Sequence, residues 1–84
     1  MPHTPDNKAF NYAERLCARL PRVLQEAREA AGVSRYALEK RSAVSRDMIG
    51  DIEHGEAVPT LHFAARLADG LGMKLWEFLK LLEE

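Results

Sequence analysis

Two short stretches with helical patterning follow one another closely in the middle of the chain, and their spacing constrains the fold more than any other feature. The first runs from Ser34 to about Ser42 and the second from Ser45 to His54, so only two or three residues connect them. Each begins with a serine, whose hydroxyl oxygen can accept a hydrogen bond from a free backbone N–H at a helix N-terminus. A connection this short forces the two helices to cross at a steep angle.

The N-terminal part of the chain carries another helical pattern, which a proline interrupts. Apolar residues spaced by three and four form a stripe there, namely Phe10, Ala13, Leu16, Cys17 and Leu20. Because proline fits best in the first turn of a helix, we expect a break or a kink at Pro21. Residues 8–31 therefore form either two helices or one long kinked helix. Gly32 is suited to end this part as a left-handed cap.

Two more helices are expected after the central pair. Thr60 is suited to cap one that ends near Gly72, and the apolar pattern from Leu75 to Leu82 predicts the last one. No alternating pattern typical of a strand appears, so we predict an all-α protein. The expected organisation is a flexible arm at residues 1–7, an N-terminal helical extension at 8–19 and one domain at 20–84.

Length and composition exclude several classes of protein. The 84 residues, 46% of them hydrophobic, suffice for one small core. Because no apolar run approaches the roughly 18 residues of a membrane span and no signal-peptide stretch is present, we expect a cytoplasmic protein. Cys17 falls on an apolar helical face and is interpreted as a buried structural thiol. His3, His54 and His62 lack the spacing of metal ligands, and no glycine-rich phosphate loop occurs, so we expect no metal, no cofactor and no enzymatic activity.

Several stretches around the central pair form one longer pattern. They are "AREAAGVS" (27–34), Leu38, "VSRDMIGDIEHG" (44–55), "PTL" (59–61) and "LADGLGM" (67–73). With these marks the chain resembles the lambda-repressor/Cro-like (XRE) helix-turn-helix family over residues 24–79, with the motif at 34–54. The resemblance implies a compact domain of five helices, here with an extra N-terminal helical segment. It also implies a sequence-specific DNA-binding transcriptional regulator, a repressor that acts as a homodimer and reads the major groove with the helix at 45–54.

The resemblance further implies an ion pair between Arg28 and Glu53, which would tie the first helix of the domain to the recognition helix. Loss of one partner would leave the other charge in a partly buried site. The inward positions of the motif, expected in the core, are Leu38, Val44, Ile49 and Ile52.

The outward positions of the recognition helix are the candidates for contact with DNA bases, namely Ser45, Arg46, Asp47 and Asp51. Arg46 is the first choice because arginine can donate two hydrogen bonds to guanine, and the alternative is a solvated surface arginine. Asp47 can accept a hydrogen bond from cytosine, but in the first turn it equally stabilises the helix dipole. Asp51 would face phosphate repulsion. Gly50 offers no contact, and we interpret it as a close approach to a neighbouring backbone.

Contacts to DNA phosphates are implied at the N-terminus of the motif's first helix and in the loop after its second. These residues are Ser34, Arg35, Tyr36, Arg41, His54 and Gly55. Arg35 would add positive charge to backbone N–H groups that already favour an anion. Tyr36 would either reach a phosphate through its hydroxyl or pack against a neighbour.

Two motif positions depart from the family. Ala43 stands where glycine is usual, so a positive φ there would store strain on the order of 1 kcal/mol. Glu39 stands where a small residue is usual. It either points outward beside Lys40 or pairs with Arg35 one turn earlier.

The charge distribution leaves a second function open. The net charge is −1, and residues 45–59 carry one basic and four acidic residues. An acidic recognition helix suits a basic protein partner better than DNA, and Met48 would add an adaptable apolar contact. The alternative is thus a protein-interaction module, such as an antitoxin or a regulator subunit. A single positive face formed by Arg35, Arg41 and Arg46 would favour DNA, whereas scattered arginines would favour a protein.

A homodimer needs an interface, which apolar residues of the last helix and of the N-terminal stripe would supply. The candidates are Phe10, Trp76, Leu81 and Leu82. The alternative is that both stripes fold back over the domain's own core.

Overall fold

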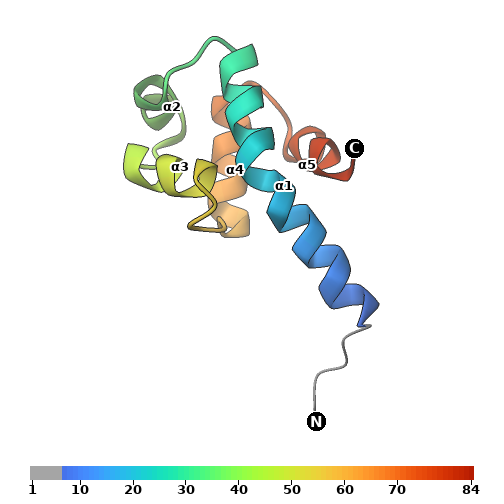
Figure 1. The fold of residues 1–84 in the computed structure, drawn as a ribbon. Helices are drawn as coiled ribbons and strands as arrows, with labels where there is room; N and C mark the ends of the chain where they lie inside the picture. The colour runs from blue at the N-terminus through green and yellow to red at the C-terminus, as the bar shows by residue number, and fades with distance from the viewer. Residues whose placement is uncertain (1–6) are drawn as a thin grey trace.

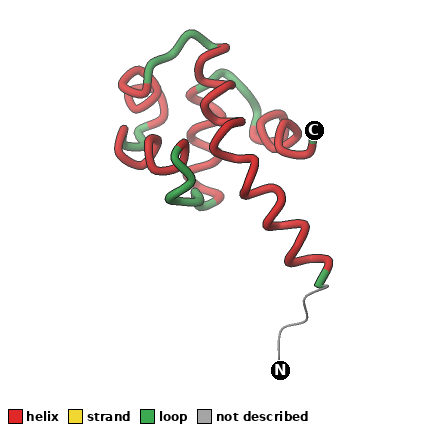
Figure 2. The backbone as a smooth tube through the Cα atoms, viewed as in Figure 1, coloured by secondary structure: helices red, strands yellow, loops and turns green. Residues whose placement is uncertain are grey.

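The chain folds into five α-helices, and residues 7–84, which the computed structural model describes, contain no strand (Figures 1 and 2). The helices are α1 (Lys8–Ala30), α2 (Arg35–Ser42), α3 (Arg46–Glu53), α4 (Leu61–Gly70) and α5 (Leu75–Glu83). The predicted all-α class is therefore confirmed. The expected arm at 1–7 lies outside the described residues except for Asn7. No helix of the described part is long and apolar enough to cross a membrane.

The first helix, α1, continues through Pro21, which decides between the two arrangements left open for this region. Pro21 removes one backbone hydrogen bond from the helix. Leu20, Val23 and Leu24 beside it are buried in the core and hold both halves of the helix in place. Figure 1 shows that the two halves of α1 point in different directions, as expected of a helix bent at a proline.

Side-chain caps begin four of the helices, the first of them at Asn7, whose Oδ1 accepts from the Phe10 N–H at 2.9 Å. Ser34, Ser45 and Thr60 each accept a hydrogen bond from the backbone N–H three residues further on, at 3.0 to 3.1 Å. Gly32 and Gly72 have φ values of 70° and 78°, and each closes the turn after a helix. The predicted caps are therefore confirmed, and they explain why such short helices begin and end where they do.

One hydrophobic core joins all five helices. In the fold, α1 packs against α3 and α5, α2 against α3 and α4, and α4 against α5. The largest fully buried side chains are Leu24, Leu38, Val44, Ile49, Ile52, Leu67 and Phe78. They include the four motif residues expected in the core. The inward side of α3 thus fixes that helix to the body, and its other side is left to face outward.

The N-terminal half of α1 projects beyond the other helices (Figure 1). Residues 7–15 are exposed, and side chains begin to join the core only from Leu16 onward. The hydroxyl of Tyr12 donates to the carboxylate of Glu83 and so connects this half to the end of α5. The apolar stripe predicted at 10–20 is therefore covered by the domain's own core only at its C-terminal end.

Candidate nucleic-acid interface

The turn between α2 and α3 contains three residues, and the first of them is strained. Ala43 has a φ of 60°, in the left-handed region, and its N–H donates to the Glu39 carbonyl at 2.8 Å. An L-residue with a Cβ pays roughly 1–2 kcal/mol in this conformation relative to the ordinary helical one. The positive φ expected at this departure from the family is thus confirmed, and the surrounding contacts have to hold the turn closed.

Two polar side chains hold the turn. Arg66 of α4 donates from Nε to the Ser42 carbonyl at 3.0 Å and from Nη2 to the Ala43 carbonyl. The buried Ser42 hydroxyl donates to the Leu38 carbonyl at 2.7 Å and accepts from the Val44 N–H at 3.1 Å. A cation at the C-terminal end of α2 also stabilises that helix's dipole. The sequence analysis missed Arg66, because a lone arginine among the apolar positions of α4 gives no signal of a partner 24 residues away.

The third helix, α3, is fixed from its inward side by one of its own carboxylates, which contacts side chains of α1 and α2. Arg28 of α1 donates to Glu53 from Nε at 2.7 Å and from Nη2 at 3.1 Å, which forms the ion pair implied by the resemblance. Arg35 of α2 donates from Nε to the same carboxylate at 2.9 Å. Because the Glu53 side chain is 0% exposed, its charge would be costly without these two partners.

The same contacts set the ionisation of Glu53. Burial alone would raise the pKa of this carboxyl, but the hydrogen bonds from Arg28 and Arg35 outweigh it and lower the pKa below its ordinary value of 4.5. Glu53 is therefore charged at neutral pH, and α3 is held by an ionised cluster.

Arg35 differs from the expectation. As a candidate phosphate contact it would extend away from the motif. Instead its Nε and Nη2 both contact Oε1 of Glu53, at 2.9 Å and 2.8 Å. A fully buried carboxylate attracts a nearby guanidinium more strongly than solvent does. Arg35 is thus first a structural residue, and the predicted alternative of an Arg35–Glu39 pair is wrong.

Gly50 has a different neighbour from the one expected. A Cβ at this position would lie 3.8 Å from Nη1 of Arg35, an ordinary contact, and would meet no neighbouring backbone. The interpretation as a close backbone approach is therefore wrong. Nη1 of Arg35 is the neighbour of this position, and the space beside Gly50 would accommodate a Cβ.

The close approach of helices occurs at Gly70 at the end of α4, a residue that the sequence analysis did not single out. A Cβ there would lie 3.0 Å from Cδ1 of Leu38 and 3.1 Å from Cβ of Ser42. The absence of a side chain at Gly70 lets α4 approach α2, and so brings Arg66 within reach of the turn.

Arg46, the first residue of α3, is held by two side chains of α2. Its Nε lies 2.9 Å from Oε1 of Glu39, and its guanidinium carbon lies 4.9 Å from the centre of the Tyr36 ring. Lys40 lies over the same ring at 5.2 Å. Neither role expected for Glu39 includes this pair, because Glu39 reaches across the turn to the next helix.

A comparison with protein families agrees with the arrangement of α2, the turn and α3. The family model described as a helix-turn-helix domain matches residues 19–77, a range that spans most of the chain and all of α2, the turn and α3. The chain belongs to the helix-turn-helix domain family. Searches among curated proteins and among solved structures found no match. A helix-turn-helix domain of this kind is typical of XRE/Cro-like DNA-binding regulators.

In this helix-turn-helix domain the other candidate base contacts lie where the recognition helix is open to solvent. Ser45 and Asp47 are exposed at its N-terminal end, and Asp51 is half-buried. Ser45 uses its hydroxyl oxygen as the cap of α3. Met48 is half-buried and packs against the core, so the expectation that it faces outward is wrong. In a helix of eight residues the apolar face is too short for periodicity to place such a residue.

The candidate phosphate contacts divide into two groups at the ends of the motif. Ser34, Tyr36 and Arg41 are exposed on or beside α2, and His54 and Gly55 are exposed in the loop after α3. Arg41 starts on the side of α2 that faces Gly70 of α4, whereas Arg35 reaches toward Gly50 of α3 and Arg46 lies over Tyr36 of α2. Arg35 and Arg46 are each paired with a carboxylate, Glu53 and Glu39 respectively, so neither contributes an unbalanced positive charge.

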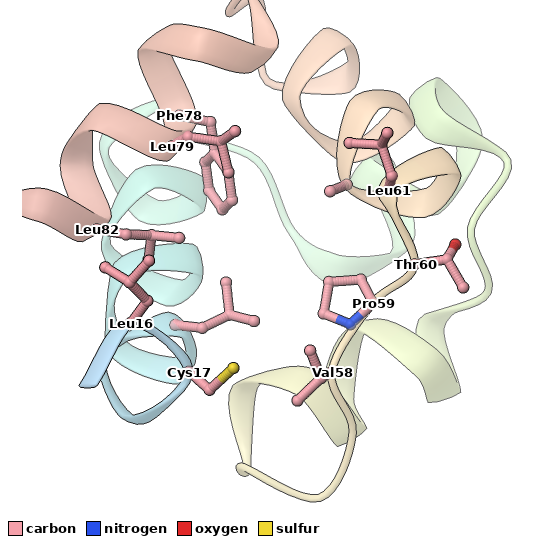
Figure 3. A pocket seen from close by; sticks show the side chains of 11 residues that line it. Leu16, Cys17, Val58, Pro59, Thr60, Leu61, Phe78, Leu79 and Leu82 are labelled. Carbon is pink, nitrogen blue, oxygen red and sulfur yellow. The ribbon is translucent and has the colours of Figure 1, made fainter. Parts of the chain in front are cut away.

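An apolar groove opens between the N-terminal half of α1, the segment before α4, and α5 (Figure 3). It has a volume of about 210 Å³. Val58, Pro59 and Leu61 form one wall, and Leu16, Leu79 and Leu82 form the other. Val58, Leu61 and Leu79 are exposed although they are apolar, with Leu61 at 71%. Such a patch is typical of a surface that contacts another molecule.

The groove corrects two earlier expectations. Cys17, interpreted as a buried thiol, is only half-buried and lines the open groove. Leu82, a candidate for the dimer interface, is buried in the core because α5 turns this side toward α1. Of the other interface candidates, Phe10 and Trp76 are exposed and Leu81 is half-buried.

Proposed function

We propose that this helix-turn-helix protein is a sequence-specific DNA-binding transcriptional regulator that reads the major groove with α3. The observation that carries the proposal is the way α3 is held. Glu53 and the buried Ile49 and Ile52 fix its inward side, while Arg46 and Asp47 remain exposed at its N-terminal end. A rigidly held helix with exposed polar residues at one end is what direct readout of base edges requires.

The charge pattern supports binding in which base recognition contributes an unusually large share. Arg46 is paired with Glu39, and Asp47 and Asp51 lie on the same helix, so few net positive charges are left to attract phosphates. Phosphate contacts are proposed for Ser34, Tyr36, Arg41, His54 and Gly55, which border α3 at both ends of the motif. Arg35 would contribute through Nη1, which is not bound to Glu53. We therefore expect weak binding to unrelated DNA and a shallow dependence on salt.

We further propose that the protein acts as a homodimer and as a repressor. One short helix reads only a few base pairs, and two copies multiply the discrimination. The apolar groove supports the dimer, since Val58 and Leu61 at its edge are apolar and exposed. Trp76 and Phe10 would contribute to the same interface. The repressor role follows the resemblance, because occupation of an operator blocks access to it.

Binding selection with a randomised pool of duplex DNA tests the proposal, followed by anisotropy titrations of the selected sequences at two salt concentrations. We expect selective binding that weakens with salt and is lost in Arg46→Ala. Arg22→Ala serves as a matched control, because Arg22 is an exposed arginine of α1 outside the motif. No enrichment at low salt by a folded protein would refute the proposal.

The second candidate function is that of a protein-interaction module, such as an antitoxin. The acidic segment at 45–59 and the neutralisation of Arg35 and Arg46 by carboxylates favour it. In that case a basic partner would bind the outward face of α3. A folded protein that enriches no DNA would make this function the better one.

A further inference from the structure

Glu39, a departure from the family pattern, lies directly beside the proposed base-reading residue. We propose that Glu39 is a positioning residue that presents Arg46 to a guanine in each half-site, with Tyr36 supporting it. This inference rests on the proposed function, since it concerns how α3 reads DNA.

The geometry restricts the guanidinium of Arg46 from two sides. Oε1 of Glu39 lies 2.9 Å from Nε, and the Tyr36 ring centre lies 4.9 Å from the guanidinium carbon. Both neighbours come from α2, which Glu53 and Arg66 fix relative to α3. A long side chain held in this way loses less conformational entropy when it binds than one that rotates freely.

The hydrogen-bond donors of Arg46 decide which base it can recognise. The closest contact of Glu39 is with Nε, and the terminal nitrogens Nη1 and Nη2 of Arg46 both carry N–H donors. In the major groove guanine presents two adjacent acceptors, O6 and N7, whereas adenine presents a donor in place of O6. The terminal N–H donors of Arg46 therefore match guanine.

A role in stability alone would not account for this arrangement. The side chains of Arg46 and Glu39 are 58% and 33% exposed, and ion pairs at such exposure contribute little to folding. A carboxylate beside the reading residue also repels phosphates. Its presence is explained if it orients Arg46, because it then increases the discrimination between bases while it lowers the attraction to DNA of any sequence.

A double-mutant cycle tests the proposal, with the selected duplex carrying each of the four base pairs at the guanine position. Wild type, Glu39→Ala, Glu39→Gln, Arg46→Ala and the double variant are titrated by anisotropy at one salt concentration, and thermal unfolding of each is recorded. We expect the wild type to prefer guanine by about tenfold. In Glu39→Ala this preference should fall to about threefold or less, while affinity for unrelated DNA stays equal or rises.

The remaining variants distinguish positioning from a structural role. Glu39→Gln keeps an acceptor oxygen and should retain part of the preference. In the Arg46→Ala background, Glu39→Ala should change the preference no further, because its effect passes through Arg46. Melting temperatures close to that of the wild type would show that the fold is intact.

Three results would overturn the inference. A guanine preference that is unchanged in Glu39→Ala would refute it while the proposed function stands. If Glu39→Ala weakened the preference at a base pair other than the guanine, and did so in the Arg46→Ala background too, Glu39 would contact a base itself. Failure of the wild type to enrich any sequence would refute the proposed function and this inference together.

Discussion

Arg66 of α4 donates a hydrogen bond from Nε to the Ser42 carbonyl at 3.0 Å, and so connects the fourth helix to the end of the second. The same guanidinium also reaches the Ala43 carbonyl. One side chain from outside the motif therefore stabilises the turn on which the orientation of α3 depends.

Removal of this contact should destabilise the protein. In Arg66→Ala the carbonyl groups of Ser42 and Ala43 lose a charged donor, and we expect the free energy of unfolding to fall by about 2 kcal/mol. Urea denaturation followed by circular dichroism measures the change. Arg22→Ala removes an arginine whose only ion pair is exposed on both sides, at 3.9 Å from Glu26, and should cost less than about 0.5 kcal/mol. Equal effects of both substitutions would contradict the role of Arg66.

Ala43→Gly should stabilise the turn. Glycine adopts a φ of 60° without the Cβ conflict, and this gain exceeds the entropy that glycine adds to the unfolded chain. We expect the melting temperature to rise by roughly 2–5 °C, equivalent to about 0.5–1 kcal/mol. Gly72→Ala is the reverse experiment at a φ of 78° with no atom within 4 Å of the new Cβ, and it should lower the melting temperature. A rise in both variants would show that backbone conformation is not the cause.

The contribution of Glu53 to the free energy of unfolding should depend on pH. Because the folded pKa of Glu53 is lowered below 4.5, the unfolded chain takes up a proton first as the pH falls. The contribution of Glu53 is then fully present above about pH 4.5 and is lost as the pH falls through the folded value. Glu53→Gln should cost about 3 kcal/mol at pH 7, since both arginines lose their anion. Unfolding experiments between pH 7 and pH 3 should show this difference narrowing toward low pH, and a constant difference would contradict the assignment.

The two helical glycines should respond in opposite directions to the same substitution. Gly50→Ala adds a Cβ in ordinary contact with Arg35 and improves helix propensity, so we expect unfolding free energy to rise by up to about 1 kcal/mol. Gly70→Ala forces the new methyl group against Leu38 and Ser42, and we expect a loss of about 1–3 kcal/mol. Thermal unfolding of the two variants side by side measures the contrast. Destabilisation by Gly50→Ala would mean that Arg35 cannot yield by a small amount.

Leu61→Lys should weaken the proposed dimer without unfolding the monomer. Leu61 is 71% exposed at the edge of the apolar groove, so a charge there meets solvent in the monomer but an apolar surface in the dimer. We expect the dimer dissociation constant, measured by analytical ultracentrifugation, to rise at least about tenfold. Ala65→Lys, on an exposed position of the same helix that does not line the groove, should leave it unchanged. A wild type that stays monomeric at all concentrations, alone and on DNA, would refute the dimer.

Local signals in the sequence predicted the helices well. Ser34, Ser45 and Thr60 cap helices through atoms only three residues away, and this kind of contact depends on little else. The continuity of α1 through Pro21 could not be predicted in the same way. It depends on the burial of neighbouring residues against helices that lie far along the chain.

The candidate site was predictable only in part for a similar reason. The Arg28–Glu53 pair follows from the family resemblance, and Arg46 follows from its place at the start of α3. The partners of Arg35, Glu39 and Arg66 depend on the directions of long side chains between helices, which residue spacing does not specify. Arg35 pairs with a carboxylate, Glu39 with a guanidinium and Arg66 with a carbonyl group, each on another helix, and the sequence order does not reveal these partners.

Glu53 gathers arginines from α1 and α2 at the inward side of α3, whereas Arg46, Asp47 and Asp51 take no part in that cluster. The cluster that holds α3 is thus separate from the surface that we propose to read DNA. Outward positions of α3 can be exchanged in a combinatorial library against a constant background, and new sequence preferences can arise without a new fold. The cluster at Glu53 makes the domain adaptable, because the contacts that hold α3 lie apart from the outward positions that can be substituted.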